Sequence, residues 1–365
     1  MTGMLTSDQV RRAPKALLHD HLDGGLRPAT IIDLAREHGY RELPTEDEAA
    51  LTTWFRRGAD RKSLELYLET FAHTTGVMQH ASAIERVAAE CVEDLAADGV
   101  VYAEVRFAPE LSRTAGLTDD EVVAAVVAGL REGERRAAAA GNRITSGAIV
   151  CGMRQGPNVM DAARAAIRHR DAGVCGFDIA GPEAGFPPGD HAEAFALLRR
   201  EGVRITCHAG ESYGPPSIRE ALAVAGTERL GHGNHLRDDI TFDAGGAPVL
   251  GRLARHVRDR GIPLESCPTS NVHTGFCAAV AEHPFDLLYR EGFKVTVNTD
   301  NRLMSGVSAT SEHLALATAF GYGLDDMETF TTTAIEAAFL ALPAREALLR
   351  DVVRPGYARL RGDAA

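Results

Sequence analysis

Two histidines near the start of the chain have a spacing that suits metal chemistry. His19 and His21 lie two residues apart in the apolar segment LLHDHLDGG, residues 17–25, and Asp23 follows at the same spacing. In a β-strand, side chains two residues apart point to the same face. Neutral imidazole is a preferred ligand of zinc and related divalent ions. Two polar residues on an exposed strand face would give the same pattern, so other ligands must come from elsewhere in the chain.

Further candidate residues follow strand-like segments later in the chain. They are Gly181 in VCGFDIAG (174–181), His208 and Glu211 in RITCHAGE (204–211), His232 in RLGHG (229–233), Ser270 and Asn271 in PLESCPTSN (263–271), and Asp300 and Asn301 in KVTVNTDN (294–301). Each has an ordinary structural interpretation when taken alone. His208 suits a hydrogen-bonded core histidine, and Asp300 suits the cap of a turn. The fold must decide whether they come together.

Eight short apolar segments, each followed by a helix-like segment, run through the chain. The predicted strands are residues 16–22, 100–110, 143–153, 174–181, 204–211, 229–233, 263–271 and 294–301. Short apolar runs without alternation are typical of parallel strands covered on both faces. Eight such units in 365 residues predict an α/β protein with a TIM (β/α)8 barrel. An open doubly wound sheet is the alternative, but no G-x-G-x-x-G motif follows the first strand, which weighs against a dinucleotide-binding sheet.

Two parts of the chain fall outside the eight repeated units. Residues 26–80 carry helical signals and predict a helical insertion after the first strand, which could act as a lid. Residues 313–341 predict extra helices near the carboxyl end. We expect residues 1–365 to form a single barrel domain, because α/β barrels longer than about 250 residues are common.

The composition narrows the class of function. Hydrophobic residues make up 45% and charged residues 25% of the chain, as in ordinary globular proteins with a large core. The formal net charge of −12 argues against a nucleic-acid-binding or basic membrane-surface protein, so a small molecule is the expected partner. No apolar run approaches about 18 residues. The six cysteines form no Cys-x-x-Cys pair and no signal peptide begins the chain, so we expect a cytoplasmic protein. Nothing in the sequence indicates the oligomeric state.

A closed barrel would gather the metal-binding candidates at one face. Functional residues of such barrels lie at the carboxyl ends of the strands. The candidates at the ends of the first, fifth and eighth predicted strands are His19, His21, His208 and Asp300. The first and eighth strands are neighbours when the barrel closes. Three imidazoles and a carboxylate make a complete ligand set for a catalytic divalent ion, with one position left for water.

The remaining candidates suit proton transfer and substrate binding. His232 on the sixth strand could be the base or the orienting partner of a metal-activated water. Glu211 could protonate a substrate nitrogen if its surroundings raise its pKa, although a carboxylate at a helix N-terminus is also favourable for electrostatic reasons alone. Asp23, Gly181 and Asn301 could supply orienting hydrogen bonds.

Six motifs in this order resemble one known family. They are HDHLDG, DIAGPE, CHAGE, LGHG, SCPTSN and NTDN, and they fall within residues 15–305. Together they resemble the adenosine deaminase family, whereas His-x-His with a late aspartate alone would indicate only the wider metal-dependent hydrolase superfamily. The resemblance implies a hydrolase of purine salvage that deaminates adenosine and 2′-deoxyadenosine to inosine and 2′-deoxyinosine, with one Zn²⁺ per subunit.

The resemblance also implies roles for the residues that match the motifs. The zinc ligands would be His19, His21, His208 and Asp300. Glu211 would donate a proton to purine N1. His232 would position the zinc-activated water that attacks C6 and help to deprotonate it.

The same resemblance assigns substrate contacts. Asp23 would contact the ribose, the Gly181 backbone would contact purine N3, and His21 would also lie near the substrate. Many members carry a second aspartate after the metal-binding aspartate, facing purine N7, but this chain has Asn301. An amide can donate a hydrogen bond to N7 without first gaining a proton. The contact can survive, although its strength and pH dependence change.

Several related activities remain open from the sequence. Adenine deaminase and deaminases of modified adenosines, such as aminodeoxyfutalosine, share the expected chemistry. AMP deaminase is disfavoured because no basic cluster near the strand ends would hold a phosphate. A non-purine metal-dependent amidohydrolase, esterase or lactonase could use the same barrel, but those sites often carry a bridging lysine that is missing from the end of the fourth strand here. A non-catalytic relative would be expected to lack a ligand or Glu211.

Overall fold

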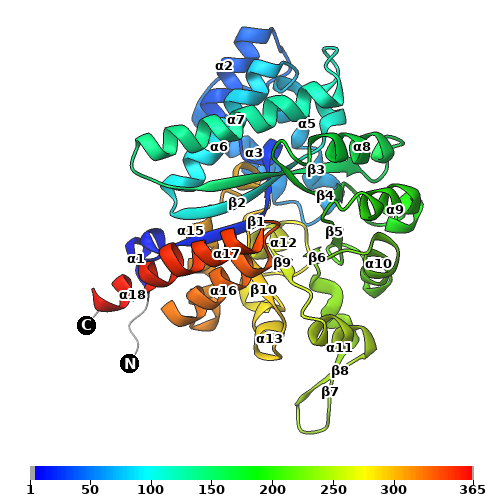
Figure 1. Ribbon diagram of the computed structural model, residues 1–365, viewed down its shortest axis with the longest axis vertical. Coiled ribbons are helices and arrows are strands. Elements are labelled where there is room, and N and C mark those ends of the chain that lie inside the picture. Colours follow the sequence, from blue (N-terminus) through cyan, green and yellow to red (C-terminus); the bar gives the residue numbers. More distant parts are fainter. Residues whose placement is uncertain (1–4, 364–365) are drawn as a thin grey trace.

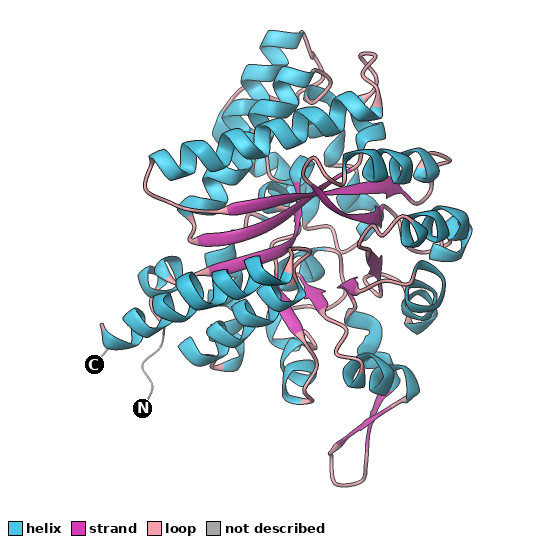
Figure 2. Cartoon of the chain, viewed as in Figure 1, coloured by secondary structure: helices cyan, strands magenta, loops and turns pink. Residues whose placement is uncertain are grey.

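The strands of the protein close into a barrel. The computed structural model describes residues 5–363, in which eight parallel strands and the helices around them form a TIM (β/α)8 barrel (Figures 1 and 2). The barrel strands are β1 (Lys15–His21), β2 (Val100–Phe107), β3 (Thr145–Met153), β4 (Val174–Ala180), β5 (Thr206–Ala209), β6 (Arg229–His232), β9 (Leu264–Ser266) and β10 (Val295–Val297). Strand pairing gives the orders β1-β2-β3-β4 and β5-β6-β9-β10, and bridges from Phe177 to Ile205 and from Asp20 to Asp300 join the two halves. The predicted fold class is confirmed.

Helices cover the outside of the barrel. Those between successive strands are α6 (Ala81–Ala97), α7 (Asp119–Ala139), α8 (Val159–His169), α9 (Ala192–Arg200), α10 (Pro215–Glu220), α11 (Arg252–Asp259) and α13 (Phe285–Arg290), while α16 (Leu324–Ala337) packs against β10 and β1. Helix α7 shows how local sequence sets these elements. Its N-cap Thr118 accepts a hydrogen bond from the Glu121 backbone, and the Glu121 carboxylate accepts one in return. Val122, Val126 and Leu130 then recur at helical spacing and are buried.

Four helices lie between β1 and α6 in the described chain. They are α2 (Pro28–His38), α3 (Glu48–Ala59), α4 (Leu64–Leu68) and α5 (Phe71–Val77). Pro28 suits the first turn of α2, and Gly39, with φ of 72°, ends it in the left-handed conformation. Helices α4 and α5 contribute side chains to a cavity at the carboxyl ends of the strands.

The structure differs from the sequence-based prediction around the later strands. The predicted strand 263–271 is shorter, because β9 ends at Ser266 and α12 (Pro268–His273) follows. Pro268 has no N–H for a strand ladder but fits the first turn of a helix. A hairpin of β7 (Ile240–Phe242) and β8 (Pro248–Leu250), absent from the prediction, precedes α11 and projects from the barrel (Figure 1).

The remaining elements are short helices and turns, some of which lie near the two ends of the described chain. The other α-helices are α1 (Ser7–Arg12), α14 (Arg302–Ser305), α15 (Ala309–Phe320), α17 (Leu342–Leu348) and α18 (Arg354–Gly362). Short 3₁₀ or π turns are η1 (Leu22–Gly24), η2 (Pro109–Ser112), η3 (Pro188–His191), η4 (Ala221–Ala225), η5 (Asn234–Asp239), η6 (Val280–Glu282) and η7 (Leu349–Val353). Helices α1 and α18 lie close together in Figure 1, and Arg12 pairs with Asp363 at 2.6 Å.

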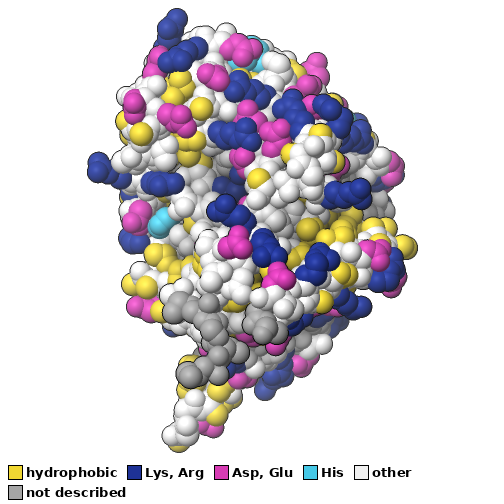
Figure 3. Space-filling view, turned by 90° about the vertical axis from the view of Figure 1, so that its left-hand side faces the viewer, with side chains coloured by type: hydrophobic (Ala, Val, Ile, Leu, Met, Phe, Trp, Pro, Cys, Tyr) yellow, Lys and Arg dark blue, Asp and Glu magenta, His cyan; other side chains and the backbone are white. Residues whose placement is uncertain are grey.

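The surface adds two observations about possible partners. On the face shown in Figure 3, Lys and Arg side chains are interspersed with Asp and Glu, so this face has no uniform basic patch. Among residues 5–363, no helix has the length and apolar character needed to cross a membrane.

Charged side chains fill part of the barrel interior. Arg106 donates to Asp178 and to Glu265, and Arg229 donates to Glu265 and to Glu104. All five side chains are at most 1% exposed. Removing one partner of such a network would leave a buried charge uncompensated. The network therefore stabilises the interior only as a complete unit.

The first prediction tests the apolar core around this network. Leu17 is a fully buried side chain of β1. Leu17→Ala removes its contacts and leaves a cavity, so we expect the free energy of unfolding to fall by about 2–5 kcal/mol, measured by urea denaturation. The matched variant Leu342→Ala changes a side chain that is 58% exposed on α17. It should alter stability by less than about 0.5 kcal/mol, and equal losses in the two variants would contradict the core position of Leu17.

Candidate metal centre and active site

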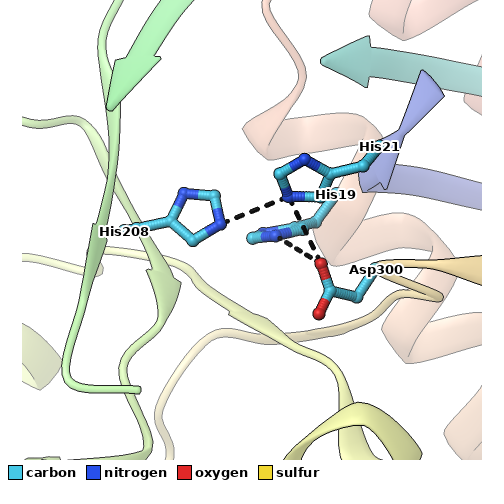
Figure 4. A group of neighbouring side chains, drawn as sticks. All are labelled: His19, His21, His208 and Asp300. Carbon is cyan, nitrogen blue, oxygen red and sulfur yellow. Dashed lines mark hydrogen bonds and ion pairs between the residues drawn. The ribbon is translucent and has the colours of Figure 1, made fainter. Parts of the chain in front are cut away.

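Four potential metal ligands meet at the carboxyl ends of the strands. His19 and His21 lie near the end of β1, His208 lies in β5, and Asp300 lies shortly after β10. The Nε2 atom of His21 is 3.4 Å from His208 Nε2 and 3.3 Å from Asp300 Oδ1. His19 Nε2 is 3.4 Å from Asp300 Oδ1. One ligand atom from each residue lies within 4.8 Å of all the others (Figure 4).

This spacing fits a single divalent ion. Nitrogen and oxygen ligands bind zinc at about 2.0–2.2 Å, so two ligands of one ion lie at most about 4.4 Å apart. The three distances above fall within that limit. The Nε2 atom of His19 is buried and has no hydrogen-bond partner. A bound ion would satisfy it. The donor set of imidazole nitrogens and one carboxylate oxygen is also the set that zinc and similar ions prefer.

A second possible ligand set overlaps the first. His19, His232, Cys267 and Asp300 also place ligand atoms within 4.8 Å of one another. Cysteine binds metals as the thiolate. Burial raises the pKa of the Cys267 thiol well above its ordinary value, and its Sγ atom lies 3.5 Å from Glu265 O. The set with three histidines is therefore the better candidate.

Buried carboxylates contact two of the imidazole rings at Nδ1, on the side away from the ligand cluster. His19 Nδ1 lies 2.9 Å from Glu265 Oε2, and His208 Nδ1 lies 2.7 Å from Asp178 Oδ2. When a neutral imidazole donates a hydrogen bond from Nδ1–H to a carboxylate, the lone pair on Nε2 points away from that carboxylate. Ser270 Oγ donates to Asp300 Oδ2 at 2.6 Å, which leaves Oδ1 facing the histidines. These contacts orient the potential ligands toward one point.

The pKa values of Asp178, Glu265 and His208 suit ligand binding. Burial raises the pKa of Asp178, but His208 and Arg106 outweigh burial and hold the pKa below its ordinary value. For Glu265, burial is likewise outweighed by Arg106 and Arg229, so its pKa is also well below the ordinary range. Burial lowers the pKa of His208. The carboxylates are therefore charged and His208 is neutral near neutral pH.

The backbone is strained at two of the site residues. His232 and Asp300 have φ values of 62° and 57°, and among the described non-glycine residues only Lys62 is similar. This left-handed conformation costs roughly 1–2 kcal/mol per residue and is concentrated at functional sites. Asp300 is held there by β1, because its N–H donates to His19 O and its carbonyl accepts from the His21 N–H.

Glu211 and His232 lie beside the cluster of potential ligands. Glu211 follows β5, His232 ends β6, and Glu211 Oε2 is 3.7 Å from His232 Nε2. Burial raises the pKa of Glu211 well above its ordinary value, and the negative charges of Asp300 and Glu183 raise it further. Burial lowers the pKa of His232. A protonated carboxyl group and a neutral imidazole therefore lie side by side.

Glu183 holds the turn that carries Glu211. Its carboxylate accepts hydrogen bonds from the backbone N–H groups of Gly210, Glu211, Ser212 and Tyr213, at 2.6–3.0 Å. Glu183 is only 2% exposed. Gly210 has φ of 77°, which permits the tight turn. One buried carboxylate therefore sets the position of Glu211.

A cavity of about 340 Å³ opens over these residues. Its apolar wall includes Leu64, Leu68 and Phe71 from the insertion, together with Leu111 and Met153 from the barrel. The acidic and histidine residues lining it are His21, Asp23, Glu69, His208, Glu211, His232 and Asp300. No lysine or arginine lines the cavity within residues 5–363. Its size is near the lower end of the range of about 300–1,000 Å³ for small-molecule sites.

Asp23, Gly181 and Asn301 present polar groups to this cavity. Burial raises the pKa of Asp23 to about 7. Gly181 lines the cavity, and this position favours glycine because φ is 102° and a Cβ atom there would lie 2.4 Å from Gln155 Oε1. Asn301 Oδ1 is buried without a hydrogen-bond partner. All three are therefore available to a bound molecule.

The structure brings the predicted site residues together, while sequence reasoning missed the groups that orient them. His19 lies in the ligand cluster, while Ser270 and Asn271 lie behind the site and contact Asp300 and His232. The other eight candidates line the cavity: His21, Asp23, Gly181, His208, Glu211, His232, Asp300 and Asn301. The missed residues include Asp178, Glu183 and Glu265. An acidic residue within an apolar strand, as in GFDIA and PLES, was the available signal.

Comparisons with known proteins agree with this geometry. The family model described as "Adenosine deaminase" matches residues 14–355. An adenosine deaminase of Mycobacteroides abscessus is 57% identical over 362 residues, which cover 99% of this chain and all of that protein. Adenosine deaminase 1 of Streptomyces coelicolor is 56% identical, with 98% of this chain and 90% of that protein covered.

A solved structure gives the same result for the fold. An amidohydrolase from Burkholderia ambifaria with bound Zn superposes with a TM-score of 0.83 at 24% identity, covering 98% of this chain and 94% of that one. At this identity the likeness concerns the fold alone. The family assignment rests on the family model, which matches nearly the whole chain, and on the high identity to curated relatives. The chain belongs to the adenosine deaminase family, whose members are metal-dependent hydrolases.

Proposed function

We propose that the protein catalyses the hydrolytic deamination of adenosine and 2′-deoxyadenosine to inosine and 2′-deoxyinosine, with release of ammonia. The observation that carries this conclusion is the convergence of His19, His21, His208 and Asp300 beside Glu211 and His232 in one cavity. The reaction adds water at C6 of the purine and removes the 6-amino group. It needs an activated water, a proton donor to the ring, and contacts that hold the nucleoside.

The four clustered side chains would hold a zinc ion, one per subunit. When bound there, zinc supplies Lewis-acid activation of the attacking water. The protein's own contribution is to set the direction of the ligand atoms. The carboxylates of Glu265 and Asp178 keep the His19 and His208 rings turned toward the cluster.

Glu211 is the proton donor to the purine ring. Its raised pKa keeps the carboxyl group protonated near neutral pH, so it can donate to N1 as C6 becomes tetrahedral. His232, whose Nε2 lies 3.7 Å from Glu211 Oε2, orients the attacking water.

The remaining polar groups hold the nucleoside. We assign Asp23 to the ribose hydroxyls, the Gly181 backbone to purine N3 and the Asn301 amide to N7. His21 adds a further contact beside the substrate. Because an amide donates without gaining a proton, Asn301 makes the N7 contact insensitive to pH.

The charges of the cavity favour a nucleoside over a nucleotide. A phosphate group is usually recognised by arginine or lysine, and the described residues that line this cavity contribute neither. Among the lining residues from the insertion, the charged one is Glu69, which is negative. The alternative substrates are adenine, a modified adenosine, or a non-purine amide. Free adenine would leave Asp23 without a ribose partner.

We also propose a cellular setting for this reaction. The six cysteines are free in the structure, which suits the reducing cytoplasm. The conversion of adenosine to inosine is a step of purine salvage. The whole chain would serve as one catalytic domain, with the insertion between β1 and α6 covering the site.

A substrate panel tests the proposed reaction. We expect ultraviolet absorbance to report turnover of adenosine and 2′-deoxyadenosine, and little turnover of adenine or AMP. Removal of metal by a chelator should abolish activity, and added zinc should restore it, because the site residues alone provide no Lewis acid. Turnover of AMP or adenine in preference to adenosine would overturn the substrate assignment while preserving the site.

Replacement of Glu211 tests the proton donor. Glu211→Gln should retain zinc but reduce kcat by about 10²–10⁴-fold, since the amide cannot donate an acidic proton. In the unaltered protein, kcat should fall as pH rises through the raised pKa of Glu211, because the acid form is then lost. The control is Glu220→Gln on α10, a carboxylate that accepts the Gly189 N–H outside the cavity. Near-normal kcat in Glu211→Gln would exclude the role.

Replacement of Glu183 tests the turn that carries Glu211. The amide of Glu183→Gln offers one oxygen instead of two and places an N–H group against backbone donors, so we expect kcat to fall by about 10–10²-fold. The lost negative charge should also lower the pKa of Glu211 and move the alkaline limb of the pH profile to lower pH.

A matched variant separates this effect from the loss of any carboxylate that accepts hydrogen bonds at the strand ends. Glu110→Gln alters another carboxylate at the strand ends, which accepts from Met153 N and Asn158 Nδ2 but does not contact Glu211. Its pH profile should be unchanged. If both variants shift the profile equally, Glu183 has no special relation to Glu211.

A further inference from the structure

A chain of three hydrogen bonds runs from the backbone N–H of Phe285, the first residue of α13, to His232. The Phe285 N–H donates to His283 Nδ1 at 3.1 Å. His283 Nε2 lies 3.1 Å from Asn271 Oδ1, and Asn271 Nδ2 lies 3.1 Å from His232 Nδ1. His283, Asn271 and His232 are all at most 3% exposed. Buried polar groups of this kind must satisfy one another.

The direction of every bond in this chain follows from its first member. A backbone N–H can only donate, so His283 Nδ1 must accept, and a ring nitrogen that accepts carries no proton. The His283 ring is therefore neutral with its proton on Nε2, and it donates to Asn271 Oδ1. This orients the amide, so that Asn271 Nδ2 donates to His232.

The last bond sets the tautomer of His232. Its Nδ1 atom accepts from Asn271, so the neutral ring carries its proton on Nε2. Nε2 is the atom that faces the cavity, 3.7 Å from Glu211 Oε2. In this state His232 can donate a hydrogen bond at Nε2, and it can accept a proton only at Nδ1, which faces Asn271 and not the substrate.

The surroundings of His283 keep the chain in one state. Burial lowers the pKa of His283 to about 3, and the nearby positive charge of Arg237 lowers it as well. No carboxylate among the described residues forms an ion pair with His283. The ring therefore remains neutral near neutral pH.

We propose that Asn271 and His283 are positioning residues that hold His232 as the Nε2–H tautomer, so that His232 donates a hydrogen bond to the attacking water and does not take its proton at Nε2. This inference rests on the proposed function for the identity of the water. The tautomer itself depends only on the contacts of this chain.

The experiment compares the tautomer and the kinetics in the zinc-loaded protein. Selective ¹⁵N labelling of histidine and two-bond ¹H–¹⁵N correlation spectra distinguish the two neutral tautomers, with the His232 signals assigned from a His232→Asn sample. We expect Nε2–H in the unaltered protein. Asn271→Asp offers only acceptors, so it should move the proton of His232 to Nδ1 and lower kcat by about 10²–10⁴-fold, with KM and zinc content unchanged.

Substitutions at His283 make a second test that does not depend on Asn271. His283→Gln keeps a donor that can reach Asn271 Oδ1, and should retain the Nε2–H tautomer and kcat within a few fold. His283→Leu removes the donor, so the amide can reverse and His232 should show a mixture of tautomers with reduced kcat. His313→Leu is the control, because His313 is also buried but contacts Ala309 O instead.

Two results would overturn the proposal. The first is a His232 with its proton on Nδ1 in the unaltered protein. The second is an unchanged tautomer in both Asn271→Asp and His283→Leu. A protein with the Nε2–H tautomer that deaminates no purine would instead preserve this inference and refute the proposed function.

Discussion

The pairing of buried carboxylates with imidazole Nδ1 atoms is the constraint on which the site depends. Glu265 and Asp178 each take the Nδ1 side of one ring, so His19 and His208 can offer only Nε2 to the centre of the cluster. Both carboxylates are held in the charged form by Arg106, deep in the barrel. The potential metal centre is therefore organised from the barrel interior outward. A barrel with an apolar interior could place the same histidines without directing them.

Closure of the barrel brings the same residues within reach of one another. The bridge between Asp20 and Asp300 joins the first and last strands, and the backbone of Asp300 pairs with both His19 and His21. This pairing also maintains the strained left-handed conformation of Asp300. The free energy of the packed barrel and its ladder hydrogen bonds thus compensates for the strain at the site. Stability and catalytic geometry share the same contacts.

The proposed proton donor, Glu211, and the proposed water-orienting residue, His232, are each held by a partner from a neighbouring part of the barrel. Glu183, beyond β4, holds the turn of Glu211 and adds a negative charge that favours its protonated form. Asn271, on α12, is proposed to set which nitrogen of His232 carries the proton. Neither partner touches the space where a substrate would lie. Their effect is to select the protonation state of the group that does.

The sequence by itself determined the fold class and the residues at the strand ends, because apolar runs that end in His, Asp or Glu mark both the strand and its chemistry. It also determined local starts such as the capping box of Thr118 and Glu121. Only the tertiary structure decided which polar groups orient the residues at the strand ends. Asp178 and Glu265 meet histidines from strands far away in the chain, and the direction of the Asn271 amide depends on a backbone N–H at Phe285. Hydrogen-bond partners and their direction depend on three-dimensional proximity, which residue spacing along one chain does not contain.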